Sequence, residues 1–240
     1  NHPEWQSSLR GFISDLLVRR GLSNTLLEDI IHYFTTGFEN VTELVSALRA
    51  IFTWLGNATT HVLNCAFSAL INLIQGMGGN LTPEEKKAMI INALLVDILT
   101  GIITPVEATA GGELKISMYA MLMSFNALKA KDTTGKFANI TLTGIITTLE
   151  AMQAGGMPFI AFINGNHFVV VTKITDTEVT YMDGGHKVTV TRQQFERMWN
   201  GRALSAFVPQ GQGGTLRMDG EIGTTLLTND EMQNIRGSGN

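Results

Sequence analysis

The chain contains a single cysteine, Cys65, at the point where a polar stretch gives way to an apolar helical pattern. Asn64 precedes it and is a favourable residue for a helix N-cap. The free backbone N–H groups and the positive dipole end of a helix N-terminus stabilise a thiolate, which is the nucleophilic form of cysteine. This position makes Cys65 a candidate nucleophile, and the alternative is a small residue buried at the start of a helix.

A nucleophilic thiol needs a base, usually histidine, and a group that orients the base. His167 begins an apolar run that ends at residue 174, and Asp183 follows the next such run. If residues 175–177 form the hairpin turn, position 167 faces position 185, and Asp183 is then the diagonal neighbour of His167 on the same face. The register therefore makes His167 a candidate base within reach of Asp183. The alternatives are a hydrogen-bonded histidine at a strand end and an aspartate that forms a turn.

The elements that carry these residues fall into two regions. Apolar residues recur at helical spacing up to residue 152, and from Pro158 onward short runs rich in Val, Ile, Phe and Thr are separated by turns of Gly, Asn and Asp. Helices are predicted over residues 65–75, from Thr82 onward, over 116–127, 144–152 and 192–199; strands are predicted over 158–163, 167–174, 178–182, 187–191 and 203–208. Helices followed by an antiparallel sheet indicate an α+β domain.

The composition excludes several classes of protein. The chain is 44% hydrophobic and 16% charged with a net charge of −4, so it can bury a core but lacks the positive field that nucleic acid or anionic lipid requires. One cysteine excludes an internal disulfide and a cysteine-rich zinc site, and none of the five histidines has the HExxH spacing, so no metal or cofactor is expected. The most apolar stretch, residues 88–104, contains Asp97 and is too short to span a membrane, so it is predicted to be a buried helix.

The chain divides into three predicted parts. Residues 1–56 are interpreted as a helical N-terminal extension, residues 57–209 as the domain with the candidate residues, and residues 210–240 as a flexible linker and a C-terminal segment. The first residue is Asn1 rather than Met, which suggests a fragment or a processed product. No signal peptide is recognisable, and this favours a cytoplasmic location.

The order of the candidate residues resembles the papain-like bacterial peptidases that process bacteriocins at the front of ABC exporters. The resemblance covers about residues 57–209 and rests on the stretches Cys65–Leu70, Pro158–Val171, Tyr181–Gly184 and Phe195–Leu204. It implies a papain-like α+β fold and cleavage of peptides after a double glycine. It also implies that Cys65 is the nucleophile, His167 the base and Asp183 its orienting residue. No transporter segments follow, so the chain is not expected to be a whole exporter. The expected partners are a peptide substrate and transporter or polyprotein neighbours.

Two positions depart from the pattern of that family. Ala66 stands where the family usually has glycine after the cysteine, and Thr59 stands where it has a glutamine that donates to the oxyanion. Thr59, Asn57 or Asn64 is a candidate replacement donor beside the Cys65 backbone N–H. Loss of one oxyanion donor typically costs about 10²–10³ in rate, so the departure concerns speed more than the type of chemistry.

The end of the chain resembles the leader peptides that this family cleaves, whose pattern is L-S-x-x-E-L-x-x-I-x-G-G. The residues in register are Leu227, Thr228, Glu231, Met232, Ile235 and Gly237, with Ser238 in place of the second glycine. Thr228 and Glu231 form a capping-box pattern for a short helix whose apolar residues suit a hydrophobic groove. Arg236 is expected to stabilise the C-terminal end of that helix. The alternative is an ordinary capped terminal helix.

The resulting hypothesis is a cysteine endopeptidase that cuts between Ser238 and Gly239 in its own C-terminal segment, within a larger polyprotein. The chain between Val208 and Ser238 is long enough to allow cleavage in cis, and cleavage in trans is equally allowed. One alternative is a module that binds leader peptides without cutting them, which the missing glutamine favours. Another is a ligase or cyclase that passes the acyl-enzyme to an amine.

Overall fold

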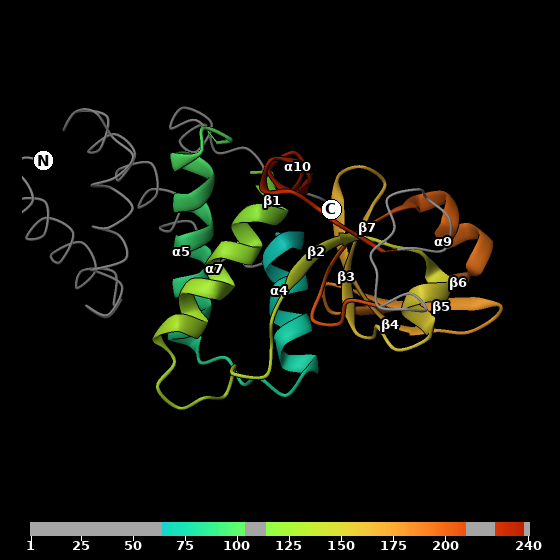
Figure 1. Cartoon of the computed structure of the whole chain (residues 1–240), viewed down its shortest axis with the longest axis horizontal. Helices are drawn as coiled ribbons and strands as arrows, with labels where there is room; N and C mark the ends of the chain where they lie inside the picture. The colour runs from blue at the N-terminus through green and yellow to red at the C-terminus, as the bar shows by residue number, and fades with distance from the viewer. Residues whose placement is uncertain (1–63, 104–113, 210–223, 238–240) are drawn as a thin grey trace, which may run out of the picture.

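The computed structural model describes residues 64–103, 114–209 and 224–237, so the predicted N-terminal extension and the linker after residue 209 lie outside the described part. The long helices lie on one side of the molecule and the main sheet lies on the other (Figure 1). The three long helices are α4 (Cys65–Gly76), α5 (Pro83–Leu99) and α7 (Met118–Lys131). The predicted α+β order, with helices first and an antiparallel sheet second, is confirmed.

The main sheet has seven strands in the order β6-β5-β4-β3-β7-β2-β8, and its neighbours are antiparallel. The strands are β2 (Thr143–Ile146), β3 (Phe159–Ile163), β4 (His167–Ile174), β5 (Glu178–Asp183), β6 (His186–Thr191), β7 (Trp199–Ser205) and β8 (Thr225–Leu226). A separate pair joins β1 (Ile116–Ser117) to β9 (Arg236–Gly237). The C-terminal segment therefore adds one strand to each sheet.

Both faces of the sheet are covered. Along β4, Phe168 and Val170 point into a core shared with the long helices, while Val169 and Val171 point into a second core. The second core packs beneath α8 (Leu149–Gln153) and α9 (Arg192–Met198). A central strand buried on both faces reads as a continuous apolar run, which is the pattern found in this part of the sequence.

The prediction of a helix over residues 144–152 is wrong in its first half. Residues 143–146 form strand β2 between β7 and β8, and helix α8 begins only at Leu149. The β-branched residues Ile145, Ile146 and Thr147 favour an extended backbone. Thr148 then caps α8, because its hydroxyl accepts from the Ala151 N–H at 3.2 Å.

The last predicted strand, over residues 203–208, is displaced. Strand β7 already begins at Trp199, directly after α9, and pairs with both β3 and β2. It ends at Ser205, whose hydroxyl accepts from the Phe207 N–H and donates to the Phe207 carbonyl, which turns the chain away from the sheet.

The apolar stretch that contains Asp97 is the buried helix α5, as predicted. Its start has the capping box of Thr82 and Glu85, since each backbone N–H donates to the side chain of the other residue. Asp97 is fully buried and accepts from the Ser117 N–H at 2.8 Å and the Ser117 hydroxyl at 2.5 Å, which ties α5 to β1. Across the described ranges, no helix combines the length and apolar character needed to cross a membrane.

Candidate active site

Cys65 is the first residue of α4, and Asn64 caps this helix as predicted. The Asn64 side chain accepts from the Ala66 N–H at 2.9 Å. Helix α4 packs along β4 with its N-terminus toward the end of the strand at which His167 lies. The Cys65 side chain is 4% exposed, so the sulfur lies beneath the surface of the structure.

His167 and Asp183 are in contact. His167 Nε2 lies 2.8 Å from Asp183 Oδ1, and their side chains are 14% and 44% exposed. The predicted register holds at this end of the hairpin, where Val170 pairs with Met182. It is wrong by one residue near the turn, where Ile174 pairs with Val179 and a bulge restores the register before the site.

The second nitrogen of the imidazole is unused. His167 Nδ1 is buried and has no hydrogen-bond partner within the described part of the chain. A buried ring nitrogen without a partner is uncommon, and such groups concentrate at functional sites. With Nε2 held by Asp183, Nδ1 is the nitrogen that can accept a proton.

The sulfur of Cys65 lies close to Phe168, the residue that follows His167 on β4. The backbone N–H groups of Phe168, Ala66 and Cys65 itself lie near the sulfur and favour its thiolate form. Asn72, two turns further along α4, donates from Nδ2 to the Gly184 carbonyl at 2.8 Å. These two contacts fix the helix with the thiol against the strands that carry the imidazole and the carboxylate.

The thiol is protonated in this arrangement. Burial raises the pKa of the Cys65 thiol from 9.0 to about 11, with a further increase from the negative charge of Asp183. The Phe168, Ala66 and Cys65 amides oppose this increase, because they donate to the thiolate form. The residue therefore needs a base to become a nucleophile at neutral pH.

The three predicted oxyanion donors are placed unequally. Asn57 and Thr59 lie outside the described residues. Asn64 uses its carbonyl oxygen as the helix cap, and its Nδ2 donates to the Leu114 carbonyl at 2.8 Å. An oxyanion role for any of the three stays a prediction.

The C-terminal segment is packed against the domain. Helix α10 (Asn229–Gln233) starts with the predicted capping box of Thr228 and Glu231 and packs against α7 (Figure 1). The apolar residues of the leader-like pattern all enter the first core, at 7%, 3% and 4% exposure for Leu227, Met232 and Ile235. The expectation for Arg236 is wrong, because α10 ends at Gln233 and Arg236 lies in strand β9.

Backbone hydrogen bonds hold this segment on both sides of α10. The Leu227 N–H donates to the Gly144 carbonyl at 2.9 Å, and the Met118 N–H donates to the Ile235 carbonyl at 2.8 Å. A Cβ on Gly144 would overlap the Met232 sulfur, so Gly144 provides the space in which that side chain lies. The receiving surface is shaped for this segment.

Gly237 brings the segment to the candidate catalytic residues. A Cβ on Gly237 would lie 2.6 and 2.8 Å from two carbons of the Phe168 ring and 3.0 Å from the Asn166 carbonyl oxygen. Asn166 and Phe168 flank His167 in the sequence, and the backbone N–H of Phe168 lies near the Cys65 sulfur, whose pKa it lowers. Space at this point excludes any side chain larger than hydrogen.

The comparison with protein families identifies this part of the chain. Residues 119–209 match the family model described as the Peptidase C39 family. This segment is therefore similar to the Peptidase C39 family. The members are cysteine peptidases that cleave leader peptides after a double glycine. The matched residues include His167 and Asp183 and begin after Cys65, which the fold places beside them.

A solved structure resembles the chain that contains this Peptidase C39 segment. It is described as a double glycine motif protease from an AMS/PCAT transporter in complex with the leader peptide. It is 18% identical, with a TM-score of 0.40, and the match covers 59% of this chain and 82% of that chain. No curated protein matches the chain.

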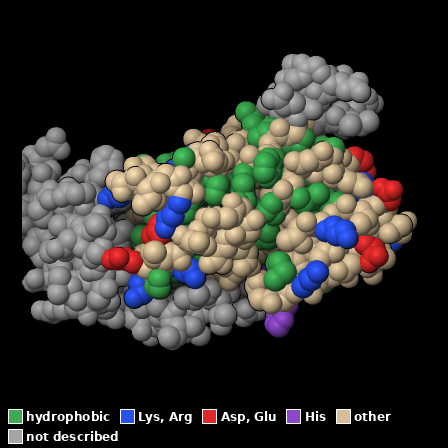
Figure 2. Space-filling view, turned by 90° about the horizontal axis from the view of Figure 1, so that it is seen from below, with side chains coloured by type: hydrophobic (Ala, Val, Ile, Leu, Met, Phe, Trp, Pro, Cys, Tyr) green, Lys and Arg blue, Asp and Glu red, His purple; other side chains and the backbone are tan. Residues whose placement is uncertain are grey.

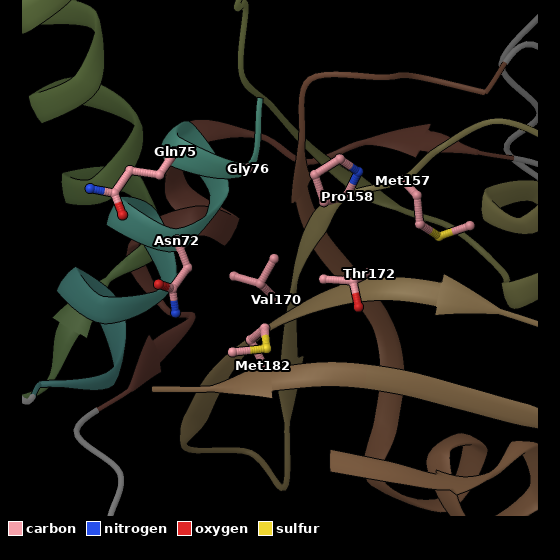
Figure 3. A pocket seen from close by; sticks show the side chains of 8 residues that line it. All are labelled: Asn72, Gln75, Gly76, Met157, Pro158, Val170, Thr172 and Met182. Atoms are coloured by element: carbon pink, nitrogen blue, oxygen red, sulfur yellow. The ribbon is translucent and has the colours of Figure 1, made fainter. Parts of the chain in front are cut away.

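A pocket of about 570 Å³ lies between α4 and the strands of the Peptidase C39 segment (Figure 3). Asn72 and Gln75 line it from the helix, Val170 and Met182 line it from the sheet, and Pro158 and Met157 lie across from the helix. On the face seen from below, hydrophobic side chains gather in the middle, with charged side chains toward the two ends (Figure 2). No three His, Cys, Asp or Glu side chains of the described residues cluster to hold a metal ion.

Several residues of the site have no signal in the sequence. Asn72 belongs to the polar side of a predicted helix, and its bond to Gly184 joins residues far apart in the chain. Gly144 was expected within a helix, where its role as space for Met232 could not be foreseen. Asp97 interrupts an apolar stretch in the sequence, and nothing in the sequence indicates that Ser117 donates hydrogen bonds to it.

Proposed function

We propose that this protein is a cysteine endopeptidase that cuts its own C-terminal segment between Ser238 and Gly239. The observation that carries the proposal is the position of Gly237, which lies against Phe168 beside the candidate base and nucleophile. The leader-like residues that precede it are buried in the core of the same chain. A segment already seated in this way needs no intermolecular encounter, which favours cleavage in cis.

The proposed catalytic residues are Cys65, His167 and Asp183. Asp183 holds His167 through Nε2, so that Nδ1 is free to take the thiol proton as the sulfur attacks the Ser238 carbonyl carbon. The imidazolium then gives this proton to the amine of Gly239, which leaves as the C–N bond breaks and the thioester forms. His167 next takes a proton from water, the hydroxide attacks the thioester, and the proton returns to the sulfur as it leaves.

The raised pKa of the thiol fits a reaction in which proton transfer accompanies attack. A thiol whose pKa is about 11 is neutral at pH 7, so the resting site holds no thiolate–imidazolium pair. Catalytic hydrogen bonds are often long in resting sites and tighten when the substrate is bound in the reactive arrangement. Deprotonation by His167 at the moment of attack supplies the nucleophile.

The same raised pKa supports a second candidate, a module that binds the leader-like segment without cutting it. A buried, neutral thiol and the absence of the family's oxyanion glutamine both slow chemistry. Burial of the segment would still serve such a module, because it would keep the polypeptide after the segment attached to the domain. Intact chain after long incubation distinguishes this candidate.

The experiment is mass spectrometry of the full chain followed by an added reporter peptide after Asn240. We expect a product that ends at Ser238 with the mass of hydrolysis, and no product from the Cys65→Ala variant. Rates that do not depend on protein concentration identify cleavage in cis. A product joined to an amine without added water identifies the ligase, and an intact chain in both samples overturns the peptidase proposal.

A further inference from the structure

A buried acidic residue lies behind the strand that receives the C-terminal segment. Asp97 is fully buried in α5, and both hydrogen bonds to its carboxylate come from Ser117, through the backbone N–H and the hydroxyl. Ser117 belongs to β1 and also caps α7, since its hydroxyl accepts from the Ala120 N–H at 3.0 Å. These bonds leave the carboxylate without a direct partner of opposite charge within the described part of the chain.

Arg236 reaches this region from the C-terminal segment. It pairs with Ser117 in the β1–β9 ladder, and its Nη2 donates to the Lys115 carbonyl at 3.3 Å. Its Nε is buried and has no hydrogen-bond partner among the described residues. Burial raises the pKa of Asp97 to about 6, and the hydrogen bonds from Ser117 and the positive charge of Arg236 oppose this increase.

Arg236 differs in this respect from the other charged residues of the segment. Asp230 and Glu231 are exposed, whereas Arg236 is half-buried with its Nε fully covered. Pairing of β9 with β1 is a backbone interaction that does not depend on side chains, so sequence selection at this position must come from what the side chain meets. Directly paired residues of antiparallel strands project their side chains to the same face, so Arg236 lies on the face from which the Ser117 hydroxyl donates to Asp97.

We propose that Asp97, held by Ser117, forms a subsite that selects a basic residue at the third position before the cut. The numbering of this position rests on the proposed cleavage after Ser238. An acidic residue at position 236 would place a second negative charge near a buried carboxylate, which is strongly unfavourable, and a neutral residue would leave that carboxylate without its countercharge. The subsite therefore discriminates among segments that share the apolar residues and the glycine.

The test measures docking of the segment separately from cleavage. The full chain carrying Cys65→Ala is treated with an added protease, and the rate at which residues 224–237 are cut reports how often the segment leaves the domain. We expect Arg236→Gln to raise this rate by about tenfold and Arg236→Glu to raise it further, while Arg236→Lys stays within about threefold of the parent. Lys115→Gln is the matched control, because this exposed side chain directly precedes β1 and its substitution leaves the backbone carbonyl in place.

A double-mutant cycle links the effect to Asp97. In the Asp97→Asn background, Arg236→Gln should change the rate of proteolysis by less than about twofold, because the negative charge that Arg236 neutralises is absent. Equal effects of Arg236→Gln with and without Asp97 overturn the subsite. If Asp97→Asn does not fold, as judged by thermal unfolding, the series at position 236 decides alone: equal rates for Gln, Glu and Lys overturn the proposal.

The outcome is separable from that of the proposed function. If the charge series changes docking but no variant with Cys65 is ever cut, the subsite stands as a binding determinant and the peptidase proposal fails. If the chain is cut and the cut rate is insensitive to the residue at 236, the peptidase proposal stands and the subsite fails.

Discussion

His167 Nε2 lies 2.8 Å from Asp183 Oδ1, while Nδ1 of the same ring is buried and has no partner in the described part of the chain. The two nitrogens are therefore in different states, one held by a carboxylate and one available. An imidazole held in this way has a fixed orientation and tautomer, which a base needs if it is to act on one particular proton.

Removal of the carboxylate should disorient the ring. We expect Asp183→Ala to lower the rate of cleavage after Ser238 by about 10²–10⁴-fold, with little change in docking of the C-terminal segment. Asp176→Asn is a suitable control, because Asp176 lies in the β4–β5 turn and its side chain accepts only from the half-buried Gln153 among the contacts described. Equal rates in Asp183→Ala and the parent chain would remove Asp183 from the mechanism.

The pH dependence of alkylation should report the raised pKa of Cys65, since this is the single cysteine in the chain. With a pKa of about 11, the thiolate fraction and the rate of labelling by iodoacetamide should rise about tenfold per pH unit from pH 7 to 10. A plateau near neutral pH would instead indicate a resting thiolate–imidazolium pair.

The same shift has a consequence for stability. The folded chain holds the thiol proton more tightly than the unfolded chain, whose thiol pKa is near 9.0. The contribution of Cys65 to the free energy of unfolding is therefore constant below pH 9 and decreases as the pH rises from about 9 to about 11. Denaturant titrations of the parent and Cys65→Ala between pH 8 and 11 should differ by an amount that follows this direction.

Two neighbouring leucines offer a matched test of docking. Leu227 is 7% exposed and lies in the core, whereas Leu226 is 53% exposed. Truncation of a buried leucine to alanine costs about 2–5 kcal/mol, so Leu227→Ala should raise the rate of proteolysis of the segment by at least about 30-fold. Leu226→Ala should leave it nearly unchanged. Similar rates for the two variants would show that the segment is not held through its apolar residues.

A methyl group at Gly237 should block the segment from the site. It would overlap the Phe168 ring and approach the Asn166 carbonyl, neither of which can move without disturbing β4. We expect Gly237→Ala to lower the rate of cleavage by at least about 100-fold, which corresponds to roughly 3 kcal/mol of overpacking. Gly185→Ala is the control, because a Cβ there meets nothing within 4 Å. Normal cleavage of Gly237→Ala would mean that the scissile bond lies elsewhere.

The starts of helices were predictable from the sequence where a single capping hydrogen bond sets them. Capping residues such as Asn64 and Thr228 act on backbone groups two or three positions away, so their effect can be read from adjacent residues. The contact between His167 and Asp183 was predictable because counting back from a hairpin turn fixes the register of two strands. The bulge near Ile174 was not, although it restored the register before the site.

The prediction of helices failed where strands from distant parts of the chain pair with a segment whose own sequence favours a helix. Gly144 begins a stretch whose apolar spacing suits a helix, yet β7 and β8 draw it into a sheet. Arg236 follows a helical pattern, yet β1 pairs with it and ends the pattern early. In both cases the deciding hydrogen bonds come from residues far away in the chain.

The amino-acid sequence by itself determined the α+β order, the candidate nucleophile, base and orienting residue, and the leader-like pattern at the C-terminus. These follow from side-chain chemistry and from short spacings, which a linear chain preserves. Only the tertiary structure decided that Gly237 lies beside Phe168 and that Asp97 lies behind the strand that receives Arg236, because burial and the meeting of distant segments depend on how the whole core packs.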